Sequence, residues 1–211
     1  MKRNEAPGLR PRAATHVRGG EAPAAGRVRI IGGQYRRTPI RVVSARGLRP
    51  TPDRVRVTVF NWLEHLLGSL AGTHALDLFA GTGALGFEMA SRGARSVMLV
   101  ESDARAAEAL RALQRRLGAP AIAIVQGDWA AALARVAPAS LDVAFLDPPY
   151  DAGLLDRALE AVRRLMRPGG VIYAEGPGAL EAARLAAAGL EIVRAGQAGV
   201  VYFHLLRAPS C

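Results

Sequence analysis

A glycine-rich turn follows the first long apolar strand expected in this 211-residue chain. Gly81, Gly83 and Gly86 satisfy the pattern G-x-G-x-x-G, which lets the backbone approach a nucleotide without a Cβ in the way. Asp77 lies four residues before Gly81, at the predicted carboxyl end of the strand. A carboxylate there repels the pyrophosphate of a dinucleotide but attracts a sulfonium and an ammonium group. The turn therefore favours S-adenosylmethionine over a nicotinamide or flavin dinucleotide.

Acidic residues also follow the next two expected strands. Glu101 ends the second strand, 18 residues after Gly83, where a carboxylate can accept hydrogen bonds from the ribose hydroxyls of either cofactor. Asp128 follows the third strand and can accept from an adenine amino group, with Trp129 near the ring. Asp128 also suits the N-cap of a helix over residues 128–136, and the two roles are compatible.

The sequence Asp147-Pro148-Pro149-Tyr150 follows a fourth apolar strand, Leu141 to Leu146. Two prolines fix the backbone and donate no N–H, so the Asp147 carboxylate and the Pro148 carbonyl form a rigid pair of acceptors. An exocyclic amine of a nucleobase can donate to both, while Tyr150 stacks on the base for about 1–3 kcal/mol. The motif therefore predicts methyl transfer to such an amine by positioning and electrostatics, without a metal or a covalent intermediate.

Apolar runs and helical spacing alternate from Ala75 onward, which predicts a mostly parallel sheet covered by helices on both faces. The last two strands are separated only by residues 195–199, so they can pair as a hairpin with one antiparallel strand. Strands are expected near 75–79, 96–100, 121–125, 141–146, 170–174, 190–194 and 200–206, and helices near 84–92, 103–117, 128–136, 152–166 and 178–188.

Upstream of this alternation, the sequence predicts a short hairpin and one helix. Apolar residues near 27–31 and 40–43 flank a glycine turn, which is typical of two short strands. Asp53 is expected to cap a helix that continues to about Leu67 and ends at Gly68.

The basic residues are concentrated in the first quarter of the chain. Residues 1–56 contain 14 Lys and Arg against three acids, whereas the remainder contains 14 against 15. Such segregation indicates a polyanionic partner.

A lone Cys211 and four scattered histidines exclude a disulfide framework and predict no metal site. No apolar stretch is long enough to cross a membrane, and the first 25 residues lack the core of a secretory signal.

With these motifs in place, the chain resembles the class I S-adenosylmethionine-dependent methyltransferases. Within them it is similar to the RsmD family, which methylates the N2 amine of a guanine in bacterial 16S ribosomal RNA. The match includes the glycine turn and Asp147 to Tyr150, and two upstream stretches narrow it to this family. These stretches are Arg29 to Arg36, and Gly47 to Thr51 with Asp53 to Arg56 and Phe60 to Leu63. Val57 departs from the family pattern, in which a glutamate usually follows Arg-Val-Arg.

The resemblance implies a Rossmann-like α/β fold with a seven-stranded, mostly parallel sheet, one antiparallel strand and a small basic N-terminal extension. It implies catalytic roles for Asp147, Pro148, Pro149 and Tyr150. The expected donor-binding residues are Thr51, Asp77, Phe79, Gly81, Gly83, Glu101, Ser102, Asp128 and Trp129. The expected RNA-binding residues are Arg29, Arg36, Arg37, Arg41, Arg49 and Arg54, whose charges would follow the phosphates.

The expected organisation is a disordered basic tail (1–26), an RNA-contacting hairpin and helix (27–70) and the methyltransferase domain (71–211). The expected partner is 16S ribosomal RNA or the small ribosomal subunit, in the cytoplasm, for a monomeric enzyme. One alternative keeps the chemistry but moves the methyl group to adenine N6 of DNA or RNA, because the Asp147 motif serves exocyclic amines in general. A nicotinamide-dependent oxidoreductase and a non-catalytic RNA-binding protein are further alternatives.

Overall fold

The computed structural model describes residues 28–42, 51–149 and 153–207. The predicted tail, Arg49 and Tyr150 lie outside these residues. The upstream elements are β1 (Val28–Arg29), β2 (Pro39–Ile40) and α1 (Asp53–Leu67). The remaining elements are β3 (His74–Asp77), α2 (Ala84–Ser91), β4 (Ser96–Glu101), α3 (Ala104–Leu117), β5 (Ile122–Gln126), α4 (Trp129–Leu133), β6 (Leu141–Leu146), α5 (Leu154–Arg163), β7 (Met166–Gly176), α6 (Ala182–Ala187), β8 (Glu191–Ala198) and β9 (Val201–Arg207).

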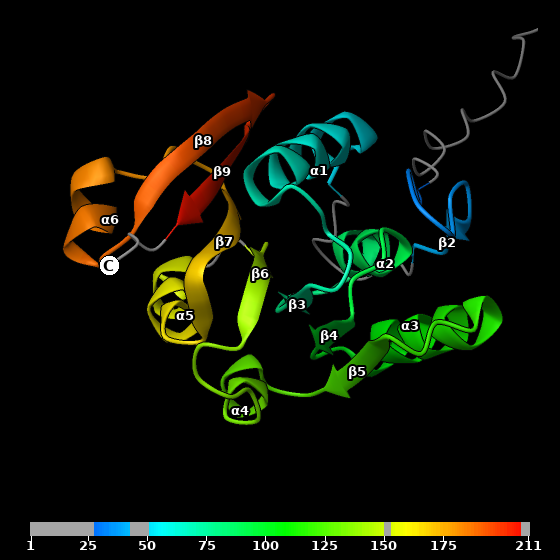
Figure 1. The fold of residues 1–211 in the computed structure, drawn as a ribbon. Coiled ribbons are helices and arrows are strands. Elements are labelled where there is room, and N and C mark those ends of the chain that lie inside the picture. The colour runs from blue at the N-terminus through cyan, green and yellow to red at the C-terminus, as the bar shows by residue number, and fades with distance from the viewer. Residues whose placement is uncertain (1–27, 43–50, 150–152, 208–211) are drawn as a thin grey trace, which may run out of the picture.

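A seven-stranded sheet forms the centre of the molecule, in the order β5-β4-β3-β6-β7-β9-β8 (Figure 1). The pairings among β3, β4, β5, β6 and β7 are parallel, and β9 is antiparallel to both β7 and β8. The last strand of the chain is thus inserted beside β7, and β8 forms the edge. The predicted sheet with a single antiparallel strand is confirmed.

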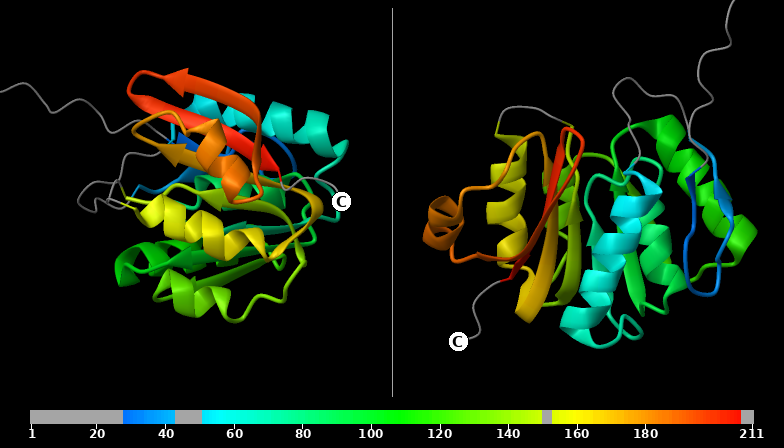
Figure 2. Two further views of the ribbon diagram at one scale, coloured as in Figure 1. Left: turned by 90° about the vertical axis from the view of Figure 1, so that its left-hand side faces the viewer. Right: turned by 90° about the horizontal axis from the view of Figure 1, so that it is seen from above.

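Helices cover both faces of this sheet, as the views in Figure 2 show. Alternate residues of each strand face opposite cores: Val143 and Phe145 of β6 join the cluster that contains residues of α1, α2 and α3. Ala144 and Leu146 join the cluster built with α4, α5 and α6. Strands that are buried on both faces require apolar residues throughout, which explains the continuous apolar runs in the sequence. Among the helices described, none combines the length and apolar character needed to cross a bilayer.

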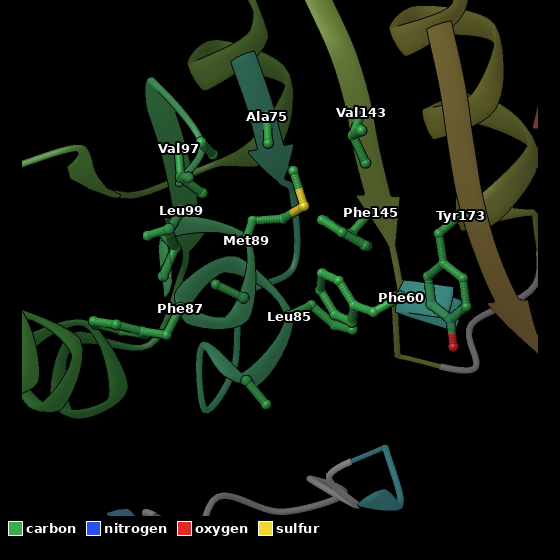
Figure 3. Close-up of a cluster of buried hydrophobic side chains, with 14 of the residues drawn as sticks. Phe60, Ala75, Leu85, Phe87, Met89, Val97, Leu99, Val143, Phe145 and Tyr173 are labelled. Atoms are coloured by element: carbon green, nitrogen blue, oxygen red, sulfur yellow. The ribbon is translucent and has the colours of Figure 1, made fainter. Parts of the chain in front are cut away.

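Three aromatic residues fix α1 against the carboxyl half of β6 and β7 (Figure 3). The ring of Phe60 on α1 lies 5.8 Å from that of Phe145, which lies 6.0 Å from the ring of Tyr173. All three side chains are fully buried. Aromatic pairs at this separation add to the free energy gained from burial, so they hold α1 and the segment before it in place.

The small β1–β2 hairpin is docked on α2 by buried polar contacts. The carboxylate of Glu88 accepts hydrogen bonds from the backbone N–H groups of Ile31 (2.6 Å) and Gly32 (2.8 Å). Gly33 has φ +72°, and a Cβ there would lie 1.9 Å from the Ser91 carbonyl oxygen. The Gly-Gly pair therefore serves close packing of this loop on the helix.

The prediction that Asp53 caps α1 is wrong. Pro52 occupies the N-cap position, without a side-chain hydrogen bond, and Asp53 is the first helical residue. Its carboxylate instead accepts from Arg56 at 2.6 Å and lies 3.4 Å from Arg29. Because Asp53 lies inside the helix rather than before it, its side chain is not at the position from which an N-cap bonds the first N–H groups.

Two predicted helices are shorter in the structure. The helix expected over 128–136 covers Trp129–Leu133, and the one expected over 178–188 covers Ala182–Ala187. The second is delayed because β7 extends to Gly176 and Pro177 follows it, so the chain remains extended beyond the predicted strand end.

Candidate active site

Acidic residues stand at the carboxyl ends of five neighbouring strands. In the order of the sheet, β5, β4, β3, β6 and β7, they are Asp128, Glu101, Asp77, Asp147 and Glu175. The chain reverses its direction of winding between β3 and β6, and ligands of open α/β sheets bind at such a switch point. The candidate site therefore lies at this edge of the sheet, centred on Asp77 and Asp147.

Asp77 is a buried carboxyl with one backbone donor. Its Oδ2 atom accepts from the N–H of Gly86 at 2.9 Å. Burial raises the pKa of Asp77 from 3.8 to about 7, against the lowering effect of the Gly86 N–H, and the charge of Glu101 raises it further. A group with this pKa gains a charge readily when a cation approaches.

The glycine turn is hydrogen-bonded to Glu101. The Oε2 atom of Glu101 accepts from the N–H of Gly81 at 2.7 Å, and Oε1 accepts from the N–H of Asp103 at the same distance. Gly83 is the N-cap of α2 and has φ +76°, and a Cβ there would lie 2.5 Å from Leu110. Gly83 is thus required by the turn and by the packing of α3 on it, and Gly81 also has a positive φ, 51°.

The far end of the predicted donor site contains an aromatic pair. The rings of Phe79 and Trp129 lie 6.2 Å apart, beside the end of β5. Asp128 accepts from the N–H of Ala131 at 3.0 Å, which confirms its predicted role as the N-cap of α4. Its side chain remains exposed, as does Ser102 after β4. The contacts of these residues with a donor stay predictions.

Asp147 lies directly after β6 and is surrounded by other acids. Burial raises its pKa well above the usual range, and the charges of Glu175 and Asp77 raise it further, while a hydrogen bond from Thr51 opposes them. Pro148 is buried and Pro149 is exposed. The structure thus brings Asp147 into the same site as Asp77.

A hydroxyl from the segment before α1 joins two of these carboxyls. The Oγ1 atom of Thr51 lies 3.5 Å from Asp147 Oδ2 and 3.3 Å from Glu175 Oε2. Tyr173 also donates to Glu175 Oε2. Thr51, predicted to contact the donor, is therefore found between the two carboxyls.

Sequence reasoning missed Glu175. Its position after the apolar run Val171 to Ala174 is the same signal that identified Asp77, Glu101 and Asp147, namely an acid at the carboxyl end of a strand. Glu175 is only 4% exposed. Burial raises its pKa, against hydrogen bonds from Tyr173 and Thr51.

Most of the predicted RNA-binding arginines lie together. A pocket of about 310 Å³ is bordered by the loop after β1 and by the start of α1. Its lining includes Arg29, Arg36, Arg37 and Arg54, together with Ile30, Ile31, Asp53 and Val57. Arg41 lies apart from them, in a pocket of about 250 Å³ with Gly81, Thr82 and Arg116.

The residues of the site fit a cationic donor. None of Asp77, Asp147 and Glu175 forms an ion pair with any residue that the structure describes. Buried carboxyls without a cation are costly, and a sulfonium with an ammonium group would relieve that cost. In the same described residues, no group of three or more metal-ligating side chains has the arrangement to hold an ion.

Comparison with known proteins identifies relatives of this chain. The family model described as "Conserved hypothetical protein 95" matches residues 28–207. Ribosomal RNA small subunit methyltransferase D of Escherichia coli (strain K12) is 39% identical over 134 residues, which cover 64% of this chain and 66% of that protein. The chain thus spans slightly less than two thirds of that relative. The Haemophilus influenzae protein of the same name is 36% identical over 157 residues, with coverages of 72% and 80%.

Solved structures share the fold. The Escherichia coli protein yhhF has a TM-score of 0.72 at 32% identity, covering 88% of this chain and 100% of that chain. A protein from Thermus thermophilus has a TM-score of 0.69 at 28% identity, with coverages of 85% and 99%.

Proposed function

Because the chain belongs to the RsmD family of class I methyltransferases, we propose that it methylates the exocyclic N2 amine of a guanine in 16S ribosomal RNA, with S-adenosylmethionine as donor. The relatives that it matches are named as methyltransferases of small-subunit ribosomal RNA. The observation that carries the proposal is the juxtaposition of Asp77 and Asp147 at the switch point of the sheet.

On the donor side, the residues that would hold S-adenosylmethionine follow the ends of β3, β4 and β5. Asp77 would face its cationic groups, Glu101 its ribose, and Asp128 with Trp129 its adenine. The donor supplies a methyl group made electrophilic by the positive sulfur. The Gly81 turn leaves the backbone accessible for close approach.

On the acceptor side, Asp147 would accept a hydrogen bond from the target amine, together with the Pro148 carbonyl. These acceptors orient the nitrogen so that its lone pair is directed at the methyl group, which lowers the barrier through positioning. As the new N–C bond forms, the sulfur–methyl bond breaks, S-adenosylhomocysteine leaves and the amine gains positive charge. The Asp147 carboxylate would stabilise that charge and accept the proton that the amine then loses.

The RNA would reach the site along the arginine-lined pocket. Four of its lining residues are arginines, and only Asp53 among them is acidic. Such a surface binds phosphates without sequence choice, so the target base must be extruded into the acidic site. The partner that we propose is 16S ribosomal RNA or the small ribosomal subunit, met in the cytoplasm by a monomer.

Methyl transfer from labelled S-adenosylmethionine tests this function. Small-subunit RNA and particles that lack the modification are incubated with the protein in parallel, and the RNA is digested to nucleosides. The expected product is N2-methylguanosine. Methyladenosine as the product, or no transfer to either substrate, would overturn the proposal.

A further inference from the structure

We infer that Glu175 selects guanine over adenine by accepting a hydrogen bond from the guanine N1–H while Asp147 accepts from the adjacent N2 amine. This inference rests on the proposed function, which assigns the amine to Asp147. It adds an acceptor that the sequence motif does not contain.

The register of the sheet places the two carboxyls side by side. Phe145 pairs with Tyr173 and Leu146 with Ala174 across the parallel strands β6 and β7. The next residues along the two strands are Asp147 and Glu175. Neighbouring strands lie about 4.8 Å apart, and residues at the same level project from the same face. Two acidic side chains therefore stand next to each other on the α1 face of the sheet.

The Glu175 carboxyl is held in a fixed orientation. Tyr173 and Thr51 both contact its Oε2 atom, Thr51 at 3.3 Å. Tyr173 is itself packed in the aromatic cluster with Phe60 and Phe145 (Figure 3). For Oε1 no hydrogen bond is found to any residue in the described part of the chain. One oxygen is thus anchored by the protein, and in this proposal the other is assigned to the base.

Two adjacent acceptors suit the edge of guanine. Guanine presents the N1–H and the N2 amine next to each other, both as donors. Adenine presents the N6 amine next to an N1 lone pair, which a carboxylate repels. The hydroxyl contacts to Oε2 oppose the rise in the pKa of Glu175 that burial causes, and a base that donates N–H groups to both carboxyls would favour their ionised, accepting forms further. A site built to receive an N–H discriminates strongly against a base that lacks it, because the buried acceptor is left unpaired.

The test compares guanine with 2-aminopurine, which keeps the 2-amino group but has a lone pair at N1. The nucleotide that the wild-type protein modifies is first mapped, and small-subunit particles are assembled with either base at that position. We expect the wild-type kcat/KM to favour guanine by at least about 100-fold. Glu175→Gln can donate an amide N–H to N1 of 2-aminopurine, so this preference should fall by about 10-fold or more.

Two further variants and the product of the wild type distinguish a wrong role for Glu175 from a folding defect and from a wrong proposed function. Glu160→Gln makes the same change at an exposed position on α5 and should leave the preference unchanged. If Glu175→Gln does not fold, Tyr173→Phe removes the hydroxyl that orients Glu175 and should reduce the preference in the same direction. Equal loss of activity on both bases would overturn the role of Glu175, even with guanine methylation intact in the wild type. A wild type that methylates another group would instead refute the proposed function.

Discussion

Replacing Asp77 by asparagine should make the free protein more stable and the donor site weaker. In the folded chain this carboxyl is buried and has a pKa of about 7, compared with an ordinary value of 3.8. The folded state therefore retains a proton that the unfolded chain has already lost, and stability falls as the pH rises between these values. Asparagine carries no charge in either state and can still accept from Gly86, so the variant escapes this loss.

The size of the effect follows from the same pKa. Between pH 5 and pH 7, the wild type loses roughly 2 kcal/mol of unfolding free energy through this group, because the slope is about 1.36 kcal/mol per pH unit and fades near the folded pKa. The unfolding free energy of Asp77→Asn should therefore exceed that of the wild type, by a difference that grows by roughly 2–3 kcal/mol from pH 5 to pH 8. Urea unfolding followed by circular dichroism at several pH values measures this difference.

Two further readouts make the prediction specific. Asp156→Asn alters a partly exposed carboxyl paired with Arg184. Its unfolding free energy should differ from that of the wild type by an amount that does not change between pH 5 and pH 8. Calorimetry with S-adenosylhomocysteine at pH 8 should show weaker binding for Asp77→Asn than for the wild type. A stability difference that is constant with pH, or unchanged ligand affinity, would refute the reasoning about Asp77.

Three other variants test separate parts of the structure. Asp147→Ala should abolish methyl transfer while RNA binding survives in a filter assay; retained turnover would remove Asp147 from the site. Arg54→Gln should weaken RNA binding and reduce the slope of log K against log salt by about one, whereas the exposed Arg135→Gln should change neither. Gly33→Ala should destabilise the fold by about 2 kcal/mol or more, because its Cβ would meet the Ser91 carbonyl. Gly199 has a similar positive φ but open space around it, so Gly199→Ala should cost about 1 kcal/mol of unfolding free energy. Equal losses of unfolding free energy in the two variants would disprove the contact with the Ser91 carbonyl.

The order of strands and helices was predictable because apolar runs and glycine stops mark each element. The short link between the last two strands also indicated their antiparallel pairing. Periodicity does not report which strand β9 joins, and the insertion of β9 beside β7 came only from the structure. The ends of α4 and α6 depend on local competition between turn and helix, which spacing alone does not resolve.

The candidate site was predictable where a motif contained the residues, as with Asp77, Glu101 and Asp147. Glu175 escaped because a single acid after a strand is equally typical of a solvated end. Its place beside Asp147 became visible only when Thr51, which is 124 residues away, was found in contact with both carboxyls. The cap assigned to Asp53 failed because the helix begins at Asp53 itself, and spacing alone does not resolve a boundary to one residue.

A crystal structure with bound S-adenosylhomocysteine tests the central claim most directly, because that claim is the meeting of donor and target amine between β3 and β6. The account predicts that the sulfur lies between Asp77 and Asp147, with the adenine toward Trp129. A ligand bound elsewhere, or a sulfur shielded from Asp147 by protein, would contradict it.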